Sequence, residues 1–220
     1  MTWTSVAAIE SPILVIPVGS FEQHGPHLPL DTDTRIAHAL STRIVDAFAP
    51  HAVLGPTITV SASGEHAGFP GTVSVGTDVT IRTFVEIGRS ADWSDGVVFV
   101  NGHGGNAEAI ATARTIITSE GQRALFWSPT AEADDDHHAG RTETSVLLYL
   151  DPNSVARDRL EAGNTQPIGE LAATLRDGGV KSVSPNGVLG DPRDASAGHG
   201  RQLFERWLGE LESAIRSWRN

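Results

Sequence analysis

Cysteine is absent from the sequence, and basic residues are scarce. The lack of cysteine excludes disulfides, thiolate nucleophiles and thiolate metal sites, so any metal ion must be held by nitrogen and oxygen ligands. Lys and Arg number 16 against 27 Asp and Glu, a formal net charge of -11. Because nucleic acids and anionic membranes attract Lys and Arg, we expect neither as a partner.

Long apolar runs are also absent. No stretch approaches the roughly 18 residues that a membrane span needs, and residues 1–9 lack the basic and apolar segments of a secretory signal. We therefore expect a cytoplasmic protein. The 220 residues suit one domain of ordinary size. Since no linker or repeat divides the chain, we predict a single domain over residues 1–220.

Apolar runs that are rich in β-branched residues alternate with segments of helical spacing. Residues 13–18, 96–100 and 123–127 read as buried strands. This alternation predicts an α/β fold with a mostly parallel sheet covered on both faces, and ligands in such sheets bind beyond the carboxyl ends of the strands. Residues 151–183 are interpreted as a loop that covers the site. The predicted helices are 34–48, 79–93, 107–119, 142–150 and 195–216.

The polar loop after the first strand holds Glu22, His24 and Asp33. Two carboxylates and an imidazole suit a divalent ion such as Zn, Mn or Fe. Each residue alone means little, because a single loop histidine is usually a surface residue and Asp33 could simply cap the next helix. Their density in one loop favours a metal site.

His103 follows the apolar run GVVFV directly, where a parallel strand brings its last side chains to the same edge of the sheet. The glycines at 102, 104 and 105 also permit a phosphate-binding turn. The segment lacks the G-x-G-x-x-G spacing and the lysine of a P-loop. A metal ligand is therefore the better interpretation of His103.

Glu143 begins a predicted helix, where a glutamate is common without any function. Two neighbouring metal ions normally share a bridging carboxylate, however. Five ligands with one shared give three protein groups per ion, which is typical of open catalytic sites. The acidic run at 134–136 is interpreted as a solvated loop.

Several motifs resemble the creatininase family, in the order in which that family has them. They are GSFEQHGPHLPLDTD at 19–33, FPGTVSVGT at 69–77, VNGHGGN at 100–106, HAGRTETS at 138–145 and GVLGDP at 187–192. The resemblance covers most of the chain and implies a three-layer α/β/α sandwich with a binuclear metal centre.

The resemblance also implies the role of each site residue. One metal ion would lie on Glu22, Asp33 and His103, and the second on His24, Asp33 and Glu143, with Asp33 as the bridge. His138 matches a histidine near the catalytic water and is the predicted proton carrier. The ions are expected to be Zn or Fe, with Mn as an alternative, and family members form homo-oligomers.

Within the family, the chain most resembles the mycofactocin precursor peptide peptidases, which remove a C-terminal Val-Tyr dipeptide from the modified precursor. Gly104 and Gly105 would leave room for a peptide, and Glu65, His66 and Arg141 are further candidates for substrate binding. One alternative is hydrolysis of creatinine or of a small cyclic or formyl amide. The other is a non-catalytic, metal-stabilised binding protein. Burial in the core is the expected place for Trp3, Trp93 and Trp207.

Overall fold

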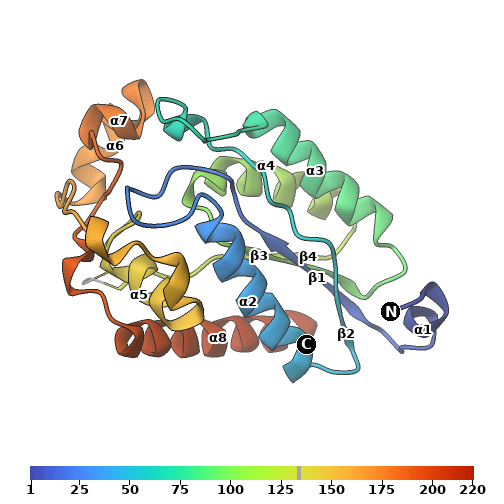
Figure 1. Cartoon of the computed structure of the whole chain (residues 1–220). Coiled ribbons are helices and arrows are strands. Elements are labelled where there is room, and N and C mark those ends of the chain that lie inside the picture. Colours follow the sequence, from blue (N-terminus) through green and yellow to red (C-terminus); the bar gives the residue numbers. More distant parts are fainter. Residues whose placement is uncertain (133–134) are drawn as a thin grey trace.

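A four-stranded parallel sheet forms the centre of the computed structural model, which describes residues 1–132 and 135–220 (Figure 1). The strands are β1 (Ile13–Val18), β2 (Ala52–Leu54), β3 (Gly96–Asn101) and β4 (Ala124–Trp127), in the order β2-β1-β3-β4. All three strand pairs formed by these residues are parallel. The predicted α/β class is thereby confirmed.

Both faces of the sheet are covered, because every residue of β1 and β3 is buried. Ile13 and Val15 point into one hydrophobic cluster and Leu14 and Ile16 into the other, as the two-residue period of a strand requires. The strand sequences are therefore continuously apolar rather than alternating.

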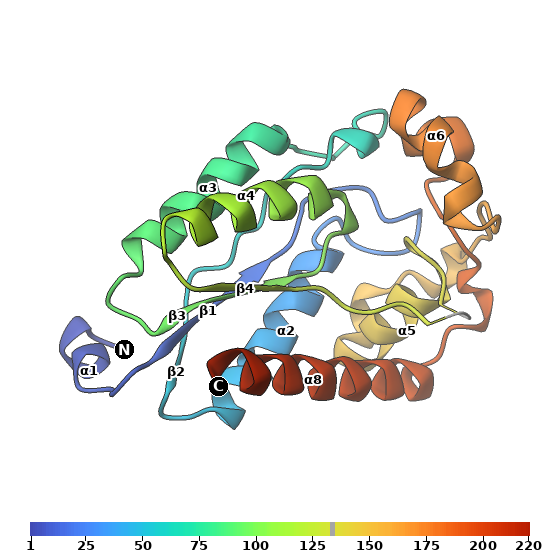
Figure 2. The ribbon, with the colours of Figure 1, turned by 180° about the vertical axis from the view of Figure 1, so that it is seen from behind.

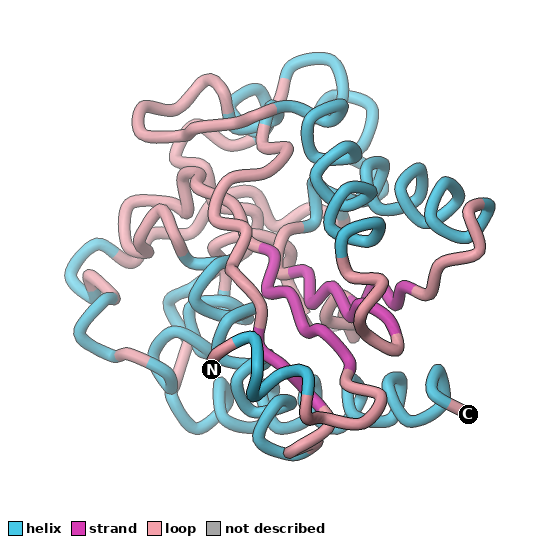
Figure 3. Tube along the Cα trace, turned by 90° about the vertical axis from the view of Figure 1, so that its right-hand side faces the viewer, coloured by secondary structure: helices cyan, strands magenta, loops and turns pink. Residues whose placement is uncertain are grey.

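Two helix layers supply these clusters (Figures 2 and 3). Helices α2, α5 and α8 lie on one face, and α3 and α4 lie on the other. The predicted three-layer sandwich is confirmed. The bounds are α2 Thr32–Ala47, α3 Gly76–Ser90, α4 Ala107–Ser119, α5 Arg141–Leu150 and α8 Ala197–Arg219.

The segment 151–183 differs from the predicted loop, because it contains the helices α6 (Ile168–Gly178) and α7 (Val180–Val183). The strand β2 and the short helix α1 (Trp3–Ala7) were also not predicted. Both are short, and β2 has only three residues, too few for a clear periodicity. None of the helices in the described part of the chain is long and apolar enough to cross a membrane.

Two of the three tryptophans that were expected in the core are not buried there. Trp207 is buried on α8, at 4% exposure, but Trp3 is 82% exposed and Trp93 is 47% exposed. Core burial was therefore the wrong expectation for Trp3 and Trp93. Trp3 lies on α1, none of whose residues is buried.

The acidic run before α5 is structural rather than solvated. Asp135 pairs with Arg206 at 2.7 Å, and Asp136 accepts a hydrogen bond from the backbone N–H of Thr142 at 2.8 Å. Asp136 thus satisfies an N–H group at the beginning of α5, which otherwise lacks a side-chain cap. The solvated-loop interpretation was wrong for these two residues, and Asp134 lies outside the described residues.

The ends of β1 and β3 bring two polar loops together. Val18 and Asn101 are paired in register at the carboxyl edge of the sheet, and the N–H of Gly102 donates to the carbonyl of Val18 at 2.8 Å. A Cβ on Gly102 would lie only 2.6 Å from the backbone oxygen of Asp33. Glycine therefore permits the first turn of α2 to pack directly against the end of β3.

Candidate metal centre

Glu22 and His24 come from the segment that joins β1 to α2, and Asp33 comes from the first turn of α2. Glu22 and His24 have no exposed surface, and Asp33, in the first turn of α2, is 1% exposed. The N–H of Glu22 donates to the carbonyl of Leu30 at 3.0 Å, so the loop closes on itself and directs these side chains inward. Burial of two carboxylates is costly unless cations accompany them.

The two oxygens of Asp33 face different histidines. Oδ1 lies 3.0 Å from His24 Nε2, and Oδ2 lies 3.2 Å from His103 Nδ1. The hydroxyl of Ser20 donates to Oδ2 at 2.9 Å and fixes the carboxylate. Asp33 therefore stands between two sets of side chains, as a bridging carboxylate would.

Among the described residues, three groups bring their ligand atoms within 4.8 Å of one another. The structure thus brings together the five residues predicted from the sequence, with Glu143 Oε2 at 3.7 Å from His24 Nε2. The groups are Glu22 with Asp33 and His103, His24 with Asp33 and Glu143, and Glu22 with His24 and His138.

The charges at this cluster call for cations. Burial opposes protonation of His24, yet Asp33, Glu143 and Glu22 raise its pKa to about 10. Burial, together with the charges of Asp33 and Glu22, raises the pKa of Glu143 to about 7 although His24 opposes this. Both oxygens of Glu22 are buried without a hydrogen-bond partner. A cluster of carboxylates with unused lone pairs fits divalent cations held by oxygen and nitrogen.

His103 has one nitrogen available for this cluster. Its Nε2–H donates to the backbone carbonyl of Ala62 at 2.8 Å, because a carbonyl can only accept. Nδ1 then carries the lone pair and lies 3.1 Å from Glu22 Oε1 and 3.2 Å from Asp33 Oδ2. A lone pair facing two carboxylates is unfavourable unless a cation or a proton lies between them. Burial opposes protonation, but Glu22, Asp33 and Glu65 hold the pKa of His103 well above its usual value.

His138 also faces the cluster. Its Nε2 lies 2.9 Å from the backbone carbonyl of Gln23, and its Nδ1 lies 3.8 Å from Glu22 Oε1. Burial, with the positive charges of His24 and His66, holds the pKa of His138 well below its usual value. The ring is therefore neutral in the metal-free protein, and its Nδ1 can bind a metal ion.

A third segment, η1 (Gly64–His66), reaches the same place. His66 Nε2 lies 3.2 Å from Glu22 Oε1, and the side-chain amide of Gln23 lies 2.9 Å from His66 Nδ1. Glu65 Oε1 lies 3.3 Å from His103 Nε2. Burial opposes ionisation of Glu65, but the hydrogen bond and charge of His103 lower its pKa, so this carboxylate is ionised.

Two cavities adjoin the cluster. One, of about 360 Å³, has the carboxylates and histidines on one side and aliphatic side chains on the other. Gly104 and Gly105 line it, as do Glu65 and His66. Arg141 is not among its lining residues; it begins α5 and is half-buried. The aliphatic wall consists of Ile168, Leu175, Val180 and Leu189.

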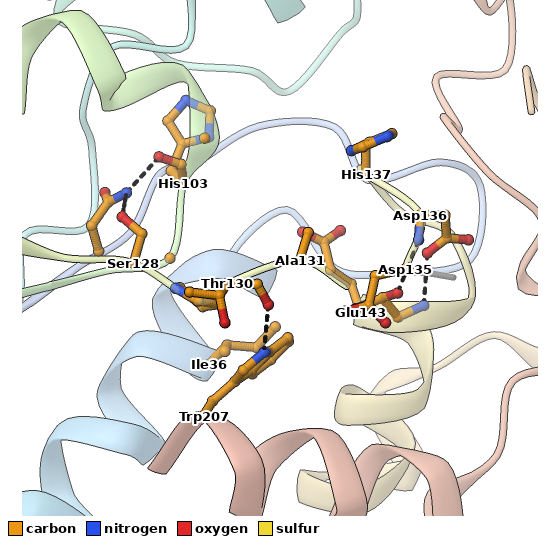
Figure 4. Close-up of a pocket in the computed structure, with 15 residues that line it drawn as sticks. Ile36, His103, Ser128, Thr130, Ala131, Asp135, Asp136, His137, Glu143 and Trp207 are labelled. Atoms are coloured by element: carbon orange, nitrogen blue, oxygen red, sulfur yellow. Dashed lines mark hydrogen bonds between the residues drawn. The ribbon is translucent and has the colours of Figure 1, made fainter. Parts of the chain in front are cut away.

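The second cavity, of about 170 Å³, is shown in Figure 4. It extends from His103 and Glu143 to Trp207, whose indole N–H donates to the carbonyl of Thr130 at 3.3 Å. The residues that line both cavities are His103, Gly104, His137 and Glu143. Two cavities therefore adjoin the same part of the cluster.

Sequence reasoning missed the aliphatic wall and Gln23. Ile168, Leu171 and Leu175 have helical spacing and could have indicated α6. Gln23, whose amide also donates to the carbonyl of Gly187 at 3.0 Å, carries no comparable pattern, because its role depends on partners far away in the chain.

The fold and the residues of the site are those of a known family of hydrolases. Residues 1–215 match the Creatininase family, described as creatinine amidohydrolase, and the chain belongs to this family. A mutant creatininase of known structure has a TM-score of 0.84 at 23% identity, over 99% of this chain and 96% of that one. Another, of the Zn-Zn type, has a TM-score of 0.82 at 22% identity, over 99% and 95%. At these identities the likeness shows the fold.

Comparison with proteins of similar sequence points to one subgroup of this family. The chain is 50% identical over 212 residues to the mycofactocin precursor peptide peptidase of Mycolicibacterium smegmatis, covering 94% of this chain and 85% of the relative. The protein of that name from Mycobacterium tuberculosis is 46% identical over 219 residues, covering 94% and 86%. The predicted family and subgroup resemblance are thereby confirmed.

Proposed function

We propose that this protein is a metal-dependent peptidase that hydrolyses an amide bond of the mycofactocin precursor peptide and releases its C-terminal Val-Tyr dipeptide. The observation that carries the hydrolytic part is Asp33, whose two oxygens face His24 and His103 at 3.0 and 3.2 Å in a buried cluster. The peptide substrate is supported by relatives with about half of their residues identical.

The geometry of the two cavities favours a peptide over a small amide. Both are lined by His103 and Glu143, so a substrate held at the cluster lies beside both cavities. Gly104 has no atom within 4 Å of the place where a Cβ would be. A cyclic amide of creatinine size would fill only part of this space.

The proposed ligands are Glu22, Asp33 and His103 for one divalent ion and His24, Asp33 and Glu143 for the other, with Zn or Fe as the expected metal and Mn as an alternative. Such ions supply a nucleophilic hydroxide near neutral pH and polarise the scissile carbonyl. Asp33 stays ionised because, although burial opposes it, His24 and hydrogen bonding from His103 hold its pKa well below the usual value.

His138 is the proposed proton carrier. Because its ring is neutral and its Nε2 faces the carbonyl of Gln23, Nδ1 can accept the proton that the water loses as it becomes the nucleophilic hydroxide. The same nitrogen can deliver this proton to the leaving amine as the C–N bond breaks. No net proton remains on His138 at the end of the cycle.

The proposal is tested by incubating the metal-loaded protein with three substrates in parallel. They are a precursor peptide ending in Val-Tyr, creatinine and a formamide. Release of the dipeptide, detected by mass spectrometry, is expected from the first only. Turnover of creatinine or the formamide without dipeptide release would contradict the peptidase proposal, and no turnover of any amide would favour a non-catalytic binding protein.

We also propose that residues 1–220 act as one domain within a homo-oligomer. Exposed apolar side chains such as Trp3 (82%) and Val73 (51%) are candidates for subunit contacts. Light scattering coupled to size exclusion should give a mass that is a multiple of 23.3 kDa. A monomer mass at micromolar concentration would contradict this.

A further inference from the structure

Glu65 is a carboxylate that neither of the two proposed ligand sets uses. It lies in the short turn η1, outside the three segments that hold those ligands, which are the β1–α2 region, the end of β3 and the first turn of α5. Oε1 lies 3.3 Å from His103 Nε2, and the side chain is 31% exposed toward the cavity that it lines. The opposite nitrogen of the same ring faces Glu22 and Asp33.

The place of this carboxylate depends on a glycine from a different segment. A Cβ on Gly105 would lie 1.9 Å from Glu65 Oε1 and 2.4 Å from His103 Nε2. The φ angle of Gly105 is outside the left-handed region, so its backbone conformation does not require glycine. The lack of space at this position does require glycine, because any side chain at 105 would displace the carboxylate or the imidazole.

A second glycine packs against the backbone of the same residue. Gly179, at the junction of α6 and α7, has a φ of 68°, and a Cβ there would lie 2.6 Å from the carbonyl oxygen of Glu65. Glu65 is therefore closely packed at its side chain by one distant segment and at its backbone by another. Such packing fixes the carboxylate beside the ring.

We propose that Glu65 is a positioning residue for His103, and that position 105 is glycine because this carboxylate occupies the space. The inference rests on the proposed metal-dependent function. Nε2–H already donates to Ala62 at 2.8 Å, which sets the tautomer, and Glu65 adds a full negative charge beside the same N–H. A carboxylate there holds the ring and makes Nδ1 a better metal donor.

The test measures zinc affinity without substrate, by competition with a chromogenic chelator. Glu65→Gln keeps the shape and removes the charge, and it should weaken zinc binding about 10- to 100-fold. Gly105→Ala should weaken it similarly, although it removes no charged group. In a Glu65→Ala background, Gly105→Ala should have a smaller effect than in the wild type, because the clash with the carboxylate is gone and only the contact with His103 Nε2 remains. Gly64→Ala, on the same turn and without an atom within 4 Å of the new Cβ, should bind zinc as the wild type does.

The outcomes separate this proposal from the proposed function. If Glu65→Gln binds zinc as tightly as the wild type, the charge of Glu65 does not support His103. If Gly105→Ala weakens zinc binding equally with and without Glu65, position 105 is not glycine because of this carboxylate. A wild-type protein that binds no divalent ion would instead refute the metal-dependent function, and this proposal with it. Circular dichroism of the metal-free variants reports folding, and the two Glu65 variants decide the question if Gly105→Ala does not fold.

Discussion

Gly102→Ala should damage the metal centre although it alters no ligand. The new Cβ would lie 2.6 Å from the backbone oxygen of Asp33, whereas such C···O contacts are normally no shorter than about 3.3 Å. The first turn of α2 must therefore move away from the end of β3 by roughly 0.7 Å to reach that contact distance. Overpacking of this kind typically costs about 1–3 kcal/mol of unfolding free energy.

The displacement acts on the two residues that the centre depends on most. Asp33 is the residue pushed, His103 is the next residue after Gly102, and their side chains are 3.2 Å apart. Metal–ligand distances tolerate deviations of about 0.2 Å, so a shift several times larger should lower zinc affinity by at least about tenfold, the lower end of the loss expected when support for a ligand is removed.

Zinc affinity measured by chelator competition, with thermal unfolding of the metal-free proteins alongside, separates the two effects. Gly104→Ala is the matched control, since it lies in the same motif and its Cβ would meet no atom within 4 Å. Equal affinity in Gly102→Ala and wild type, or a greater loss in Gly104→Ala, would refute the steric reasoning.

Three further results are expected. Asp33→Asn should reduce the metal content from two ions to fewer than one per chain, whereas Glu143→Gln should retain one; elemental analysis distinguishes these, and two ions in Asp33→Asn would exclude the bridge. His138→Ala should keep both ions and lower the turnover number by about 10²- to 10⁴-fold, and loss of an ion would make it a ligand with Glu22 and His24. Because the pKa of His24 is raised to about 10, its protonation stabilises the metal-free protein fully below pH 6.5, and this contribution is lost as the pH rises through about 10. Urea denaturation should show the metal-free free energy of unfolding falling in that window by about 1.4 kcal/mol per pH unit for this proton, and equal slopes with and without zinc would contradict the assignment.

The parts of the fold that local sequence determines were predictable. The runs at Ile13–Val18 and Gly96–Asn101 are buried on both faces, so their apolar character alone identified two central strands. Glu22, His24 and Asp33 were predictable because they crowd into one loop after such a strand. His103 was predictable because it comes directly after the central strand Gly96–Asn101.

Other features depend on contacts between distant segments, which leave no local pattern. Glu65 reaches His103 only because Gly105 lacks a side chain, and neither residue by itself indicates the other. Asp136 looked like part of a solvated acidic run, but its carboxylate binds backbone N–H groups at the beginning of α5. The helix α6 was not predicted, because the prolines and glycines around it are typical of a loop, although its apolar residues have helical spacing.

The most direct test of the binuclear centre is a titration of the metal-free protein with zinc. At each zinc addition, the rate of dipeptide release from a precursor ending in Val-Tyr is measured. We expect no release without metal, and a rate that rises until two equivalents of zinc per chain have been added. Full activity in the presence of a chelator, or a rate that is already maximal at one equivalent, would contradict it.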